Sequence, residues 1–347
     1  DRFGFDPATA HGNFTSGGSE ANLTAMVVAL THAFPAFADD GARGLSGRPL
    51  LYVSEEAHHS FEKNAHIMGI GRRSVRLVPV DDDLKLRPEA LTAMVAEDRA
   101  RGGLPFMVVG TAGTTSAGVI DPLEAVAGFC AREGLWFHAD AAWGGAAMLS
   151  PRLREHLRGM ERADSVTCDA HKYFSVSMGA GMFFCRHRDA VARSFGVHAP
   201  YVLSSILGTN DPYGTTLQWS RRFIGLKLFM TLAELGEEGM VEMIEGQAEM
   251  GELLRRRLGE REWITVGETP LPLVCFSHRR LRDDPERLGA VLQQVYARRR
   301  AWISEAVLRG RERVLRACIT SFKTTPEDLE ILIDELDGAL EATAGGA

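Results

Sequence analysis

The sequence predicts an α/β fold in which a mostly parallel sheet carries the functional residues and a smaller α/β domain follows. Apolar runs at 49–53, 105–110 and 136–140 have the length and composition of buried strands, and helical patterns separate them. This alternation favours parallel strands joined by right-handed crossovers. Each run also ends in a polar or glycine-rich loop, and ligands bind outside the carboxyl ends of such strands. We therefore expect the functional residues at these strand ends.

Composition narrows the function classes to consider. The chain has 347 residues, of which 45% are hydrophobic and 24% charged, as in an ordinary globular protein. A net charge of −7 argues against a nucleic-acid partner, and no apolar run approaches the length of a membrane span. The cysteines are scattered without a Cys-x-x-Cys pair, and no secretion signal is visible. We expect a cytoplasmic protein with neither a disulfide framework nor a metal site.

The first motif is a glycine turn that leads into a helix at 23–30. Gly17 and Gly18 allow close approach to the backbone, and Ser16 or Ser19 can add a hydroxyl group. The N–H groups at a helix start are unpaired and carry partial positive charge, which makes such a turn a phosphate site. A plain capped helix explains the same residues equally well. This stretch lacks the Gly-Lys-Ser/Thr ending of a Walker loop, and it does not match the Gly-x-Gly-x-x-Gly pattern of dinucleotide-binding proteins.

Two histidines follow the strand at 49–53. His58 and His59 are adjacent at the start of a helix, where they point in different directions, so a paired metal site is not expected. A flat imidazole can instead stack on a planar ligand, although a histidine in this position more often bonds the backbone at a helix entry. A further strand is predicted at 72–80 and a surface helix at 87–101.

The next two strands end in residues suited to binding. The run 105–110 leads into a hydroxyl-rich loop, after which Asp121 and Pro122 are expected to begin the helix at 123–133, with the aspartate as its cap. The following strand ends in Asp140, and small residues after it leave room beside the carboxylate. That carboxylate either faces a flat ligand or caps the next helix.

A lysine follows the strand predicted at 165–168, in the motif Asp169-Ala-His-Lys172. A lone lysine is usually a solvated surface residue. Here it joins a phosphate cradle, a histidine, a hydroxyl-rich loop and an aspartate at matching strand ends. Pyridoxal phosphate needs this set, because its phosphate binds helix N–H groups, its pyridine nitrogen pairs with a carboxylate, and its aldehyde condenses with a lysine amine. The sequence therefore predicts pyridoxal 5'-phosphate as the cofactor.

The remaining chain is predicted to form a second domain. An amphipathic helix is expected at 222–235, and a long helix from Gly236 leads out of the first domain, so we divide the chain into 1–235 and 236–347. Thr325 has the position of an N-cap for the last helix. The other predicted elements are strands within 263–276, a helix at 284–300, and strands at 301–308 and 313–319.

Five short motifs mark the predicted strand ends: Thr15-Ser-Gly-Gly-Ser-Glu-Ala-Asn22, Ala57-His-His-Ser-Phe-Glu62, Gly113-Thr-Thr115, His138-Ala-Asp-Ala-Ala142 and Asp169-Ala-His-Lys172. Together they resemble the group II pyridoxal-phosphate-dependent amino-acid decarboxylases, a family that includes the aromatic-L-amino-acid, glutamate and diaminobutyrate decarboxylases. The resemblance runs from about Gly12 to the end of the chain. It implies the aspartate-aminotransferase fold (fold type I), with a large mostly parallel-sheet domain and a small C-terminal α/β domain.

The resemblance also implies a role for each residue of the predicted site. Lys172 carries the Schiff base, Asp140 pairs with the pyridine nitrogen, and His58 stacks on one face of the ring. His171 lies beside the lysine near the phosphate, and Ala142 packs under the ring. The cofactor shell is completed by Gly18, Ser19, Thr115 and Asp169, with Thr114 as an alternative to its neighbour.

The implied activity is that of a carboxy-lyase, which converts an L-amino acid to the primary amine and CO2. In this family a tyrosine on a loop near the site is the candidate acid that protonates Cα, which indicates Tyr213, with Tyr201 as the alternative. Lys172, His58 and His171 complete the expected catalytic set. The substrate is a small-molecule amino acid whose side chain the sequence leaves open.

The resemblance carries two further expectations, about assembly and about the first residues. Members of the family form homodimers, and we expect the same here. They also carry an N-terminal segment before the region that opens this chain at Asp1, so we expect a preceding segment that this sequence lacks.

Two other interpretations stay open. One is another fold type I reaction, such as transamination, carbon–carbon lyase action or decarboxylation-coupled oxidative deamination. The other is a non-catalytic homologue that only binds the cofactor. An intact lysine at position 172 argues against the second.

Overall fold

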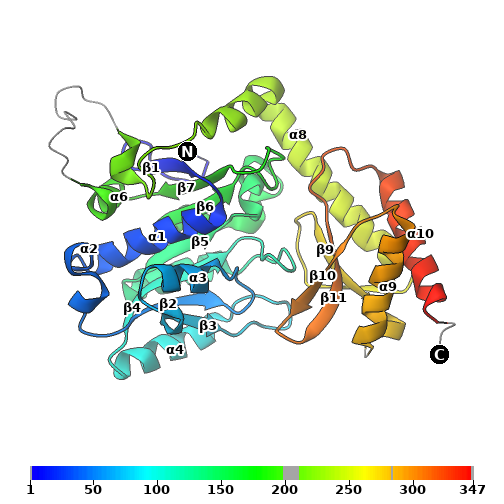
Figure 1. Ribbon diagram of the computed structural model, residues 1–347, viewed down its shortest axis with the longest axis horizontal. Coiled ribbons are helices and arrows are strands. Elements are labelled where there is room, and N and C mark those ends of the chain that lie inside the picture. The colour runs from blue at the N-terminus through cyan, green and yellow to red at the C-terminus, as the bar shows by residue number, and fades with distance from the viewer. Residues whose placement is uncertain (1, 198–210, 283, 345–347) are drawn as a thin grey trace.

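The structure is a computed structural model that describes residues 2–197, 211–282 and 284–344, and these residues form two sheets (Figure 1). The larger sheet has the strand order β1-β7-β6-β5-β4-β2-β3, and the smaller has the order β10-β11-β9-β8. The predicted α/β class is confirmed. The strands of the large sheet are β1 (His11–Thr15), β2 (Pro49–Ser54), β3 (Val75–Val78), β4 (Leu104–Thr111), β5 (Trp136–Asp140), β6 (Ser165–Asp169) and β7 (Gly181–Cys185).

The large sheet is parallel from β6 to β3, whereas β7 is antiparallel to β6 and β1 is antiparallel to β7. The carboxyl ends of β4, β5 and β6 therefore meet at one edge, where Thr111, Asp140 and Asp169 are the last residues. The strand predicted at 72–80 is shorter than expected, because 72–74 forms a 3-10 turn and only Val75–Val78 joins the sheet.

Helices cover both faces of the large sheet. Successive side chains of a strand point to opposite faces of the sheet. Leu51 and Val53 of β2 therefore pack beneath the helix that begins at Gly18, whereas Tyr52 lies in the core on the other face. One face is covered by α1 (Gly18–Ala33), α3 (Ser60–Ile67) and α6 (Arg188–Phe195), the other by α4 (Pro88–Ala100) and α5 (Leu123–Glu133), and the short α2 (Phe37–Asp40) follows α1.

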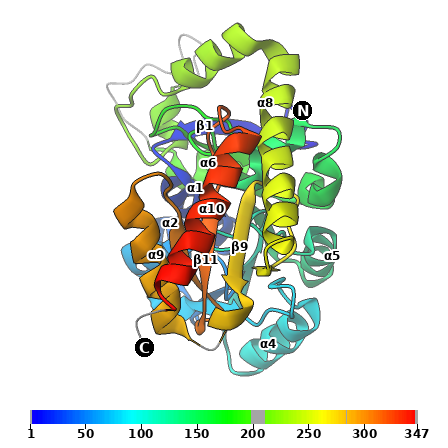
Figure 2. The same cartoon turned by 90° about the vertical axis from the view of Figure 1, so that its right-hand side faces the viewer.

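The small sheet is antiparallel throughout, and three helices pack with it: α9, α10 and the last part of the long helix 225–259 (Figure 2). A separate apolar core lies between them, in which Phe276, Leu315 and Leu336 are fully buried. The predicted cap at Thr325 is confirmed, since this residue and Asp328 form a reciprocal pair of hydrogen bonds. The elements are β8 (Trp263–Val266), β9 (Leu273–His278), β10 (Ser304–Leu308), β11 (Glu312–Cys318), α9 (Pro285–Arg298) and α10 (Pro326–Ala342).

A long helix, α8 (Gly225–Gly259), runs from the large sheet to the small one (Figures 1 and 2). It is broken at Gly236, where φ is 66° and ψ is −176°, a conformation that glycine adopts without steric cost. The predicted break at Gly236 is confirmed, although the first part begins at Gly225 and not at 222. The division into two domains at this point stays a prediction. Within the described residues no helix has both the length and the apolar character needed to cross a membrane.

Asp121 does not cap the helix at 123–133, and that prediction is wrong. Its carboxylate accepts hydrogen bonds from the backbone N–H groups of Leu86 and Thr111, at 2.8 Å each, and α5 begins after Pro122 without a side-chain cap. Burial raises the pKa of Asp121 to about 6. The residue ties the loop before α4 to the end of β4, because two buried N–H groups there need an acceptor.

Candidate active site

A cavity of about 240 Å³ lies at the carboxyl ends of β4, β5 and β6, beside the first turn of α1. It brings together side chains from the beginning and the middle of the chain. The nine residues predicted to contact the cofactor all line it: Gly18, Ser19, His58, Thr115, Asp140, Ala142, Asp169, His171 and Lys172. Their individual roles stay predictions.

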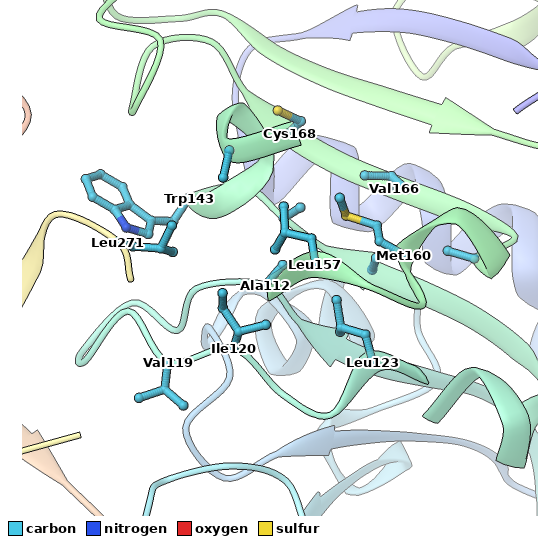
Figure 3. Close-up of a cluster of buried hydrophobic side chains, with 14 of the residues drawn as sticks. Ala112, Val119, Ile120, Leu123, Trp143, Leu157, Met160, Val166, Cys168 and Leu271 are labelled. Atoms are coloured by element: carbon cyan, nitrogen blue, oxygen red, sulfur yellow. The ribbon is translucent and has the colours of Figure 1, made fainter. Parts of the chain in front are cut away.

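Five lining residues are outside this predicted set: Gly17, Asn22, Thr111, Gly113 and Trp143. Trp143 stacks on Tyr173 and lies beside Leu271, from the loop before β9 (Figure 3). A Cβ atom on Gly113 would come within 2.8 Å of Trp143 Cδ1 and 2.9 Å of Leu271 Cδ1, so only glycine fits there. Asn22 and Gly113 stand inside the quoted motifs, and that position was the signal that could have found them.

Lys172 lies in the turn after β6, with its amine 2.9 Å from Asp169 Oδ2. The lysine side chain is one-third exposed, whereas the aspartate side chain is almost fully buried. The carboxylate thus orients the amine and leaves it accessible to a small molecule. The other oxygen, Asp169 Oδ1, is buried and has no hydrogen-bond partner among the described residues. A buried acceptor without a donor marks a place where a ligand group can bind.

His171 lies between the lysine turn and the glycine turn. Its Nδ1 accepts a hydrogen bond from the Ala180 backbone N–H at 3.1 Å, so in a neutral ring the hydrogen sits on Nε2. That nitrogen is 3.8 Å from Asp169 Oδ2. On the other side, a Cβ atom on Gly17 would approach His171 Cε1 to 3.4 Å, so the ring lies directly against the glycine turn.

The start of α1 has the geometry of a phosphate cradle. The helix begins at Gly18, so its first N–H groups have no carbonyl partner within the helix. A Cβ atom on Gly18 would lie 2.8 Å from Asp169 Oδ2, so any side chain there would fill the cradle. Of the two serines considered, Ser19 lines the cavity, whereas Ser16 donates its hydroxyl hydrogen to Glu20.

The structure bears on the alternatives left open at His58 and Thr115. His58 Nδ1 accepts a hydrogen bond from the Ser60 backbone N–H at 3.1 Å, so the backbone bond is confirmed. The same ring lines the cavity, and its stacking on a planar ligand stays a prediction. Burial lowers the pKa of His58, which favours the neutral ring. Thr115 lines the cavity, while the buried Thr114 hydroxyl accepts from the Val119 N–H at 3.1 Å.

Asp140 ends β5 and is 3% exposed. Its Oδ1 accepts a hydrogen bond from the Ala142 backbone N–H at 3.2 Å, and its Oδ2 accepts one from the Asn22 side chain at 2.9 Å. His138, two residues earlier on the same strand, contacts Asn22 from the other side. Both donors are uncharged groups, so neither of them forms an ion pair with this carboxylate.

His138 gives a pH dependence to stability. Burial lowers its pKa to about 4 from an ordinary 6.5, so the unfolded chain takes up this proton at a higher pH than the folded chain. We therefore expect the free energy of unfolding to fall as the pH drops from 6.5 toward 4. His138→Gln should lack this part of the loss. Urea unfolding of the wild type and His138→Gln between pH 4 and 6.5 measures this difference. Free energies of unfolding that fall equally with pH in both proteins would contradict the lowered pKa of His138.

Tyr213 is not brought to the cavity. It lies in a 3-10 turn, Pro212–Thr215, and its ring stacks on Trp219 with the centroids 4.6 Å apart. Among the described residues it is not one of those that line the cavity. Its role as proton donor stays a prediction, and the alternative, Tyr201, lies outside the described residues.

The groups in the cavity fit the cofactor predicted from the sequence. An amine, a carboxylate and an open helix start are what its aldehyde, pyridine nitrogen and phosphate need, and all three line one cavity. Gly18 leaves the cradle open, and the unpaired Asp169 Oδ1 offers a further acceptor. The part of the chain that the structure describes contains no group of three or more His, Cys, Asp or Glu side chains that could hold a metal ion.

Comparison with known proteins shows what the chain is similar to. Residues 3–279 match the model of the pyridoxal-dependent decarboxylase conserved domain. The chain is 31% identical over 345 residues to acidic amino acid decarboxylase GADL1 of Bos taurus, covering 94% of this chain and 66% of that protein. It is 31% identical over 352 residues to cysteine sulfinic acid decarboxylase of Homo sapiens, covering 95% of this chain and 70% of that protein.

Solved structures share the fold. Mouse CSAD matches with a TM-score of 0.91 at 28% identity, over 97% of this chain and 73% of that one. Oryza sativa TDC with PLP and tryptamine matches with a TM-score of 0.89 at 26% identity, over 98% and 72%. The predicted fold type is confirmed. The chain spans 62–66% of the length of the GADL1 relatives from Bos taurus, Mus musculus and Homo sapiens.

Proposed function

The chain belongs to the pyridoxal-dependent decarboxylase family, and we propose that it removes the α-carboxylate of an L-amino acid as CO2 and releases the primary amine. The observation that carries this proposal is the cavity in which Lys172, Asp140 and the start of α1 meet. Relatives that are named as amino-acid decarboxylases support it.

Three groups of the cavity would hold pyridoxal phosphate. When bound, it supplies an electron sink for the pair left behind as the Cα–carboxylate bond breaks. The Lys172 amine would hold the aldehyde carbon and yield that position to the substrate amine. The Asp140 carboxylate would face the pyridine nitrogen and favour its protonated form by opposite charge. The first N–H groups of α1, at Gly18 and Ser19, would bind the phosphate.

The other lining residues would orient the cofactor and the reacting bond. His58, which burial keeps neutral, would stack on one ring face, and Ala142 would pack on the other. His171, Thr115 and Asp169 would complete the shell around the phosphate and the lysine. A substrate reacts fastest when its Cα–carboxylate bond is perpendicular to the plane of the cofactor ring, because the breaking bond then overlaps the π system of that ring.

The products distinguish decarboxylation from the alternative reactions. We expect CO2 and primary amine in equal amounts. An aminotransferase would release an oxo acid without CO2, and coupled oxidative deamination would release CO2 together with an aldehyde and ammonia. Cofactor binding without any product would indicate a non-catalytic homologue and contradict the proposal.

Acidic L-amino acids are the proposed substrate class. The support is that relatives 31% identical to this chain are named as acidic amino acid and cysteine sulfinic acid decarboxylases. Aspartate, glutamate and cysteine sulfinate can be compared with tryptophan, because a solved neighbour was determined with tryptamine. Faster CO2 release from the acidic set supports the class, and faster release from tryptophan contradicts it.

Gly18→Ala is expected to weaken pyridoxal phosphate binding by roughly tenfold or more. The added methyl group would lie 2.8 Å from Asp169 Oδ2, inside the cradle. Gly246→Ala, within α8, is the matched control, since its Cβ meets nothing within 4 Å. It should bind the cofactor normally and gain up to about 1 kcal/mol of stability. Equal dissociation constants for Gly18→Ala and the wild type, by fluorescence titration, would count against the cradle.

Tyr213→Phe tests the predicted proton donor. Loss of a general acid is expected to lower kcat by roughly 10²-fold or more with little change in KM. Tyr296→Phe is the control, because that hydroxyl donates to the Ile303 carbonyl in the small sheet region. An unchanged kcat in Tyr213→Phe would remove this tyrosine from the mechanism and make Tyr201→Phe the next variant to assay.

A homodimer is the proposed assembly, and exposed apolar side chains near the start of α8 support it. Phe223, Phe229 and Met230 are 79%, 64% and 58% exposed, and Trp219 is 54% exposed. Large apolar patches on a soluble protein mark contact surfaces. Light scattering tests the assembly: twice the chain mass of 37.9 kDa supports it, and the single mass contradicts it.

The cytoplasm is the proposed location. All five cysteines are free and four of them are buried, which suits a reducing compartment. Recovery of the tagged protein from a secreted or membrane fraction would contradict this placement.

A further inference from the structure

A buried chain of hydrogen bonds runs from Asp140 away from the cavity into the core. Asn22 Nδ2 lies 2.9 Å from Asp140 Oδ2, and Asn22 Oδ1 lies 3.1 Å from His138 Nε2. His138 Nδ1 lies 2.8 Å from Ser165 Oγ, which is also 2.8 Å from the indole nitrogen of Trp136. These side chains come from α1, β5 and β6, and each is at most 5% exposed.

The two ends of this chain fix the direction of its hydrogens. The Trp136 indole can only donate, so Ser165 Oγ accepts from it. At the other end the Asp140 carboxylate can only accept, so Asn22 directs its NH2 group to Asp140 and its oxygen to His138 Nε2. His138 then accepts at Nδ1 and carries its hydrogen on Nε2. This is a neutral tautomer, in agreement with burial, which lowers the pKa of this ring to about 4.

The Asn22 amide is oriented by the same logic. Its oxygen faces the N–H of His138, so its NH2 group faces Asp140. The same NH2 group also reaches Ser60 Oγ at 3.2 Å. The chain thus ends by donating to an oxygen that accepts most strongly when the carboxylate is ionised. The hydrogen bonds of His138 and Asn22 thus favour the charged form of Asp140 and hold its Oδ2 atom in one position.

We propose that Asn22 and His138 are positioning residues that hold the Asp140 carboxylate ionised and aimed at the cavity, where it pairs with the pyridine nitrogen of bound pyridoxal phosphate. The inference rests on the proposed function. A buried carboxylate without donors takes up a proton and loses its charge. An uncharged donor offsets burial without competing for the carboxylate, whereas a lysine or arginine at position 22 would pair with Asp140 itself.

Asn22→Leu removes the donor at nearly constant volume, and Thr167 Oγ1, 3.3 Å from His138 Nε2, remains as an acceptor for the histidine. The dissociation constant for pyridoxal phosphate is expected to rise roughly 10- to 100-fold, as for loss of a hydrogen bond to a charged group. The visible band of the bound cofactor is expected to shift its wavelength or its pH dependence, which a merely structural role would not cause.

Tyr52→Phe is the matched control. It deletes a buried hydroxyl that donates to the Asp98 carboxylate at 2.9 Å, in the same sheet but among residues that do not line the cavity. This variant should lose stability while keeping the wild-type band and affinity. A change in Asn22→Leu that Tyr52→Phe reproduces would overturn the proposal, because it would reflect general loss of packing.

His138→Gln and His138→Leu form a second pair, which decides the question when Asn22→Leu does not fold. A glutamine amide can donate to Asn22 as the Nε2 hydrogen does, so His138→Gln should keep the band and the affinity, and His138→Leu should lose them. If the wild type, His138→Leu and Asn22→Leu had the same visible band and the same affinity for pyridoxal phosphate, the proposal would be overturned. The hydrogen-bond chain would then have a structural role only. A wild-type protein that binds no pyridoxal phosphate would instead overturn the proposed function, so the two failures differ.

Discussion

Lys172→Ala is expected to lower kcat for CO2 release by roughly 10⁴-fold or more. The variant lacks the amine that would hold the cofactor aldehyde and later displace the product amine. It also removes the cation that lies 2.9 Å from Asp169 Oδ2, and this aspartate side chain is 1% exposed. A loss of stability is therefore expected as well, because a buried carboxylate loses its nearest positive partner.

Lys63→Ala is the control for this variant. Lys63 is exposed on α3, close in sequence to His58, and its removal should leave kcat within about twofold of the wild type. The assay is release of labelled CO2 from the carboxyl carbon, with the folded state of each variant checked by circular dichroism. Turnover by Lys172→Ala at a tenth of the wild-type rate would exclude this lysine from the chemistry.

The second large loss of activity is expected for Asp140→Asn, in which kcat/KM should fall by roughly 10³-fold. The substitution keeps the size of the side chain and an oxygen that can accept from Asn22, so the fold should persist. What is lost is the negative charge that favours a protonated pyridine nitrogen, and with it the capacity to draw electrons from the breaking bond.

Asp98→Asn separates this effect from the general cost of altering a buried aspartate. Asp98 is 7% exposed and pairs with Arg76 at 2.8 Å, in the core on one face of the same sheet. This control is expected to lose stability with kcat/KM unchanged. If Asp140→Asn kept the wild-type kcat/KM while Asp98→Asn behaved as expected, the assignment of Asp140 to the pyridine nitrogen would be wrong.

The sequence predicted the cavity well because its residues obey local rules. A parallel strand must end at a fixed edge, so Asp140 after one apolar run and Lys172 after another arrive at the same edge. A helix start needs no tertiary contact to be recognised, which is why Gly18 could be placed. The break at Gly236 was visible for the same reason, as a glycine between two helical patterns.

The features that the sequence missed depend on contacts between distant parts of the chain. Asn22 and His138 are 116 positions apart, and their hydrogen bond exists only once α1 lies over β5. Asp121 has the pattern of a helix cap, but two buried N–H groups from other segments bind its carboxylate instead. Tyr213 stacks on Trp219, six residues later, and spacing alone could not show that this stack is outside the cavity lining.

The central claim is that Lys172 holds pyridoxal phosphate in this cavity, and one measurement tests it most directly. The purified protein, supplied with the cofactor, is followed by visible absorbance before and after borohydride, and the reduced protein is then digested and mapped. We expect a visible band that borohydride abolishes, with the cofactor label on the peptide that contains Lys172 and no label in Lys172→Ala. A protein that stays colourless with added cofactor, or a label on another lysine, would contradict the account.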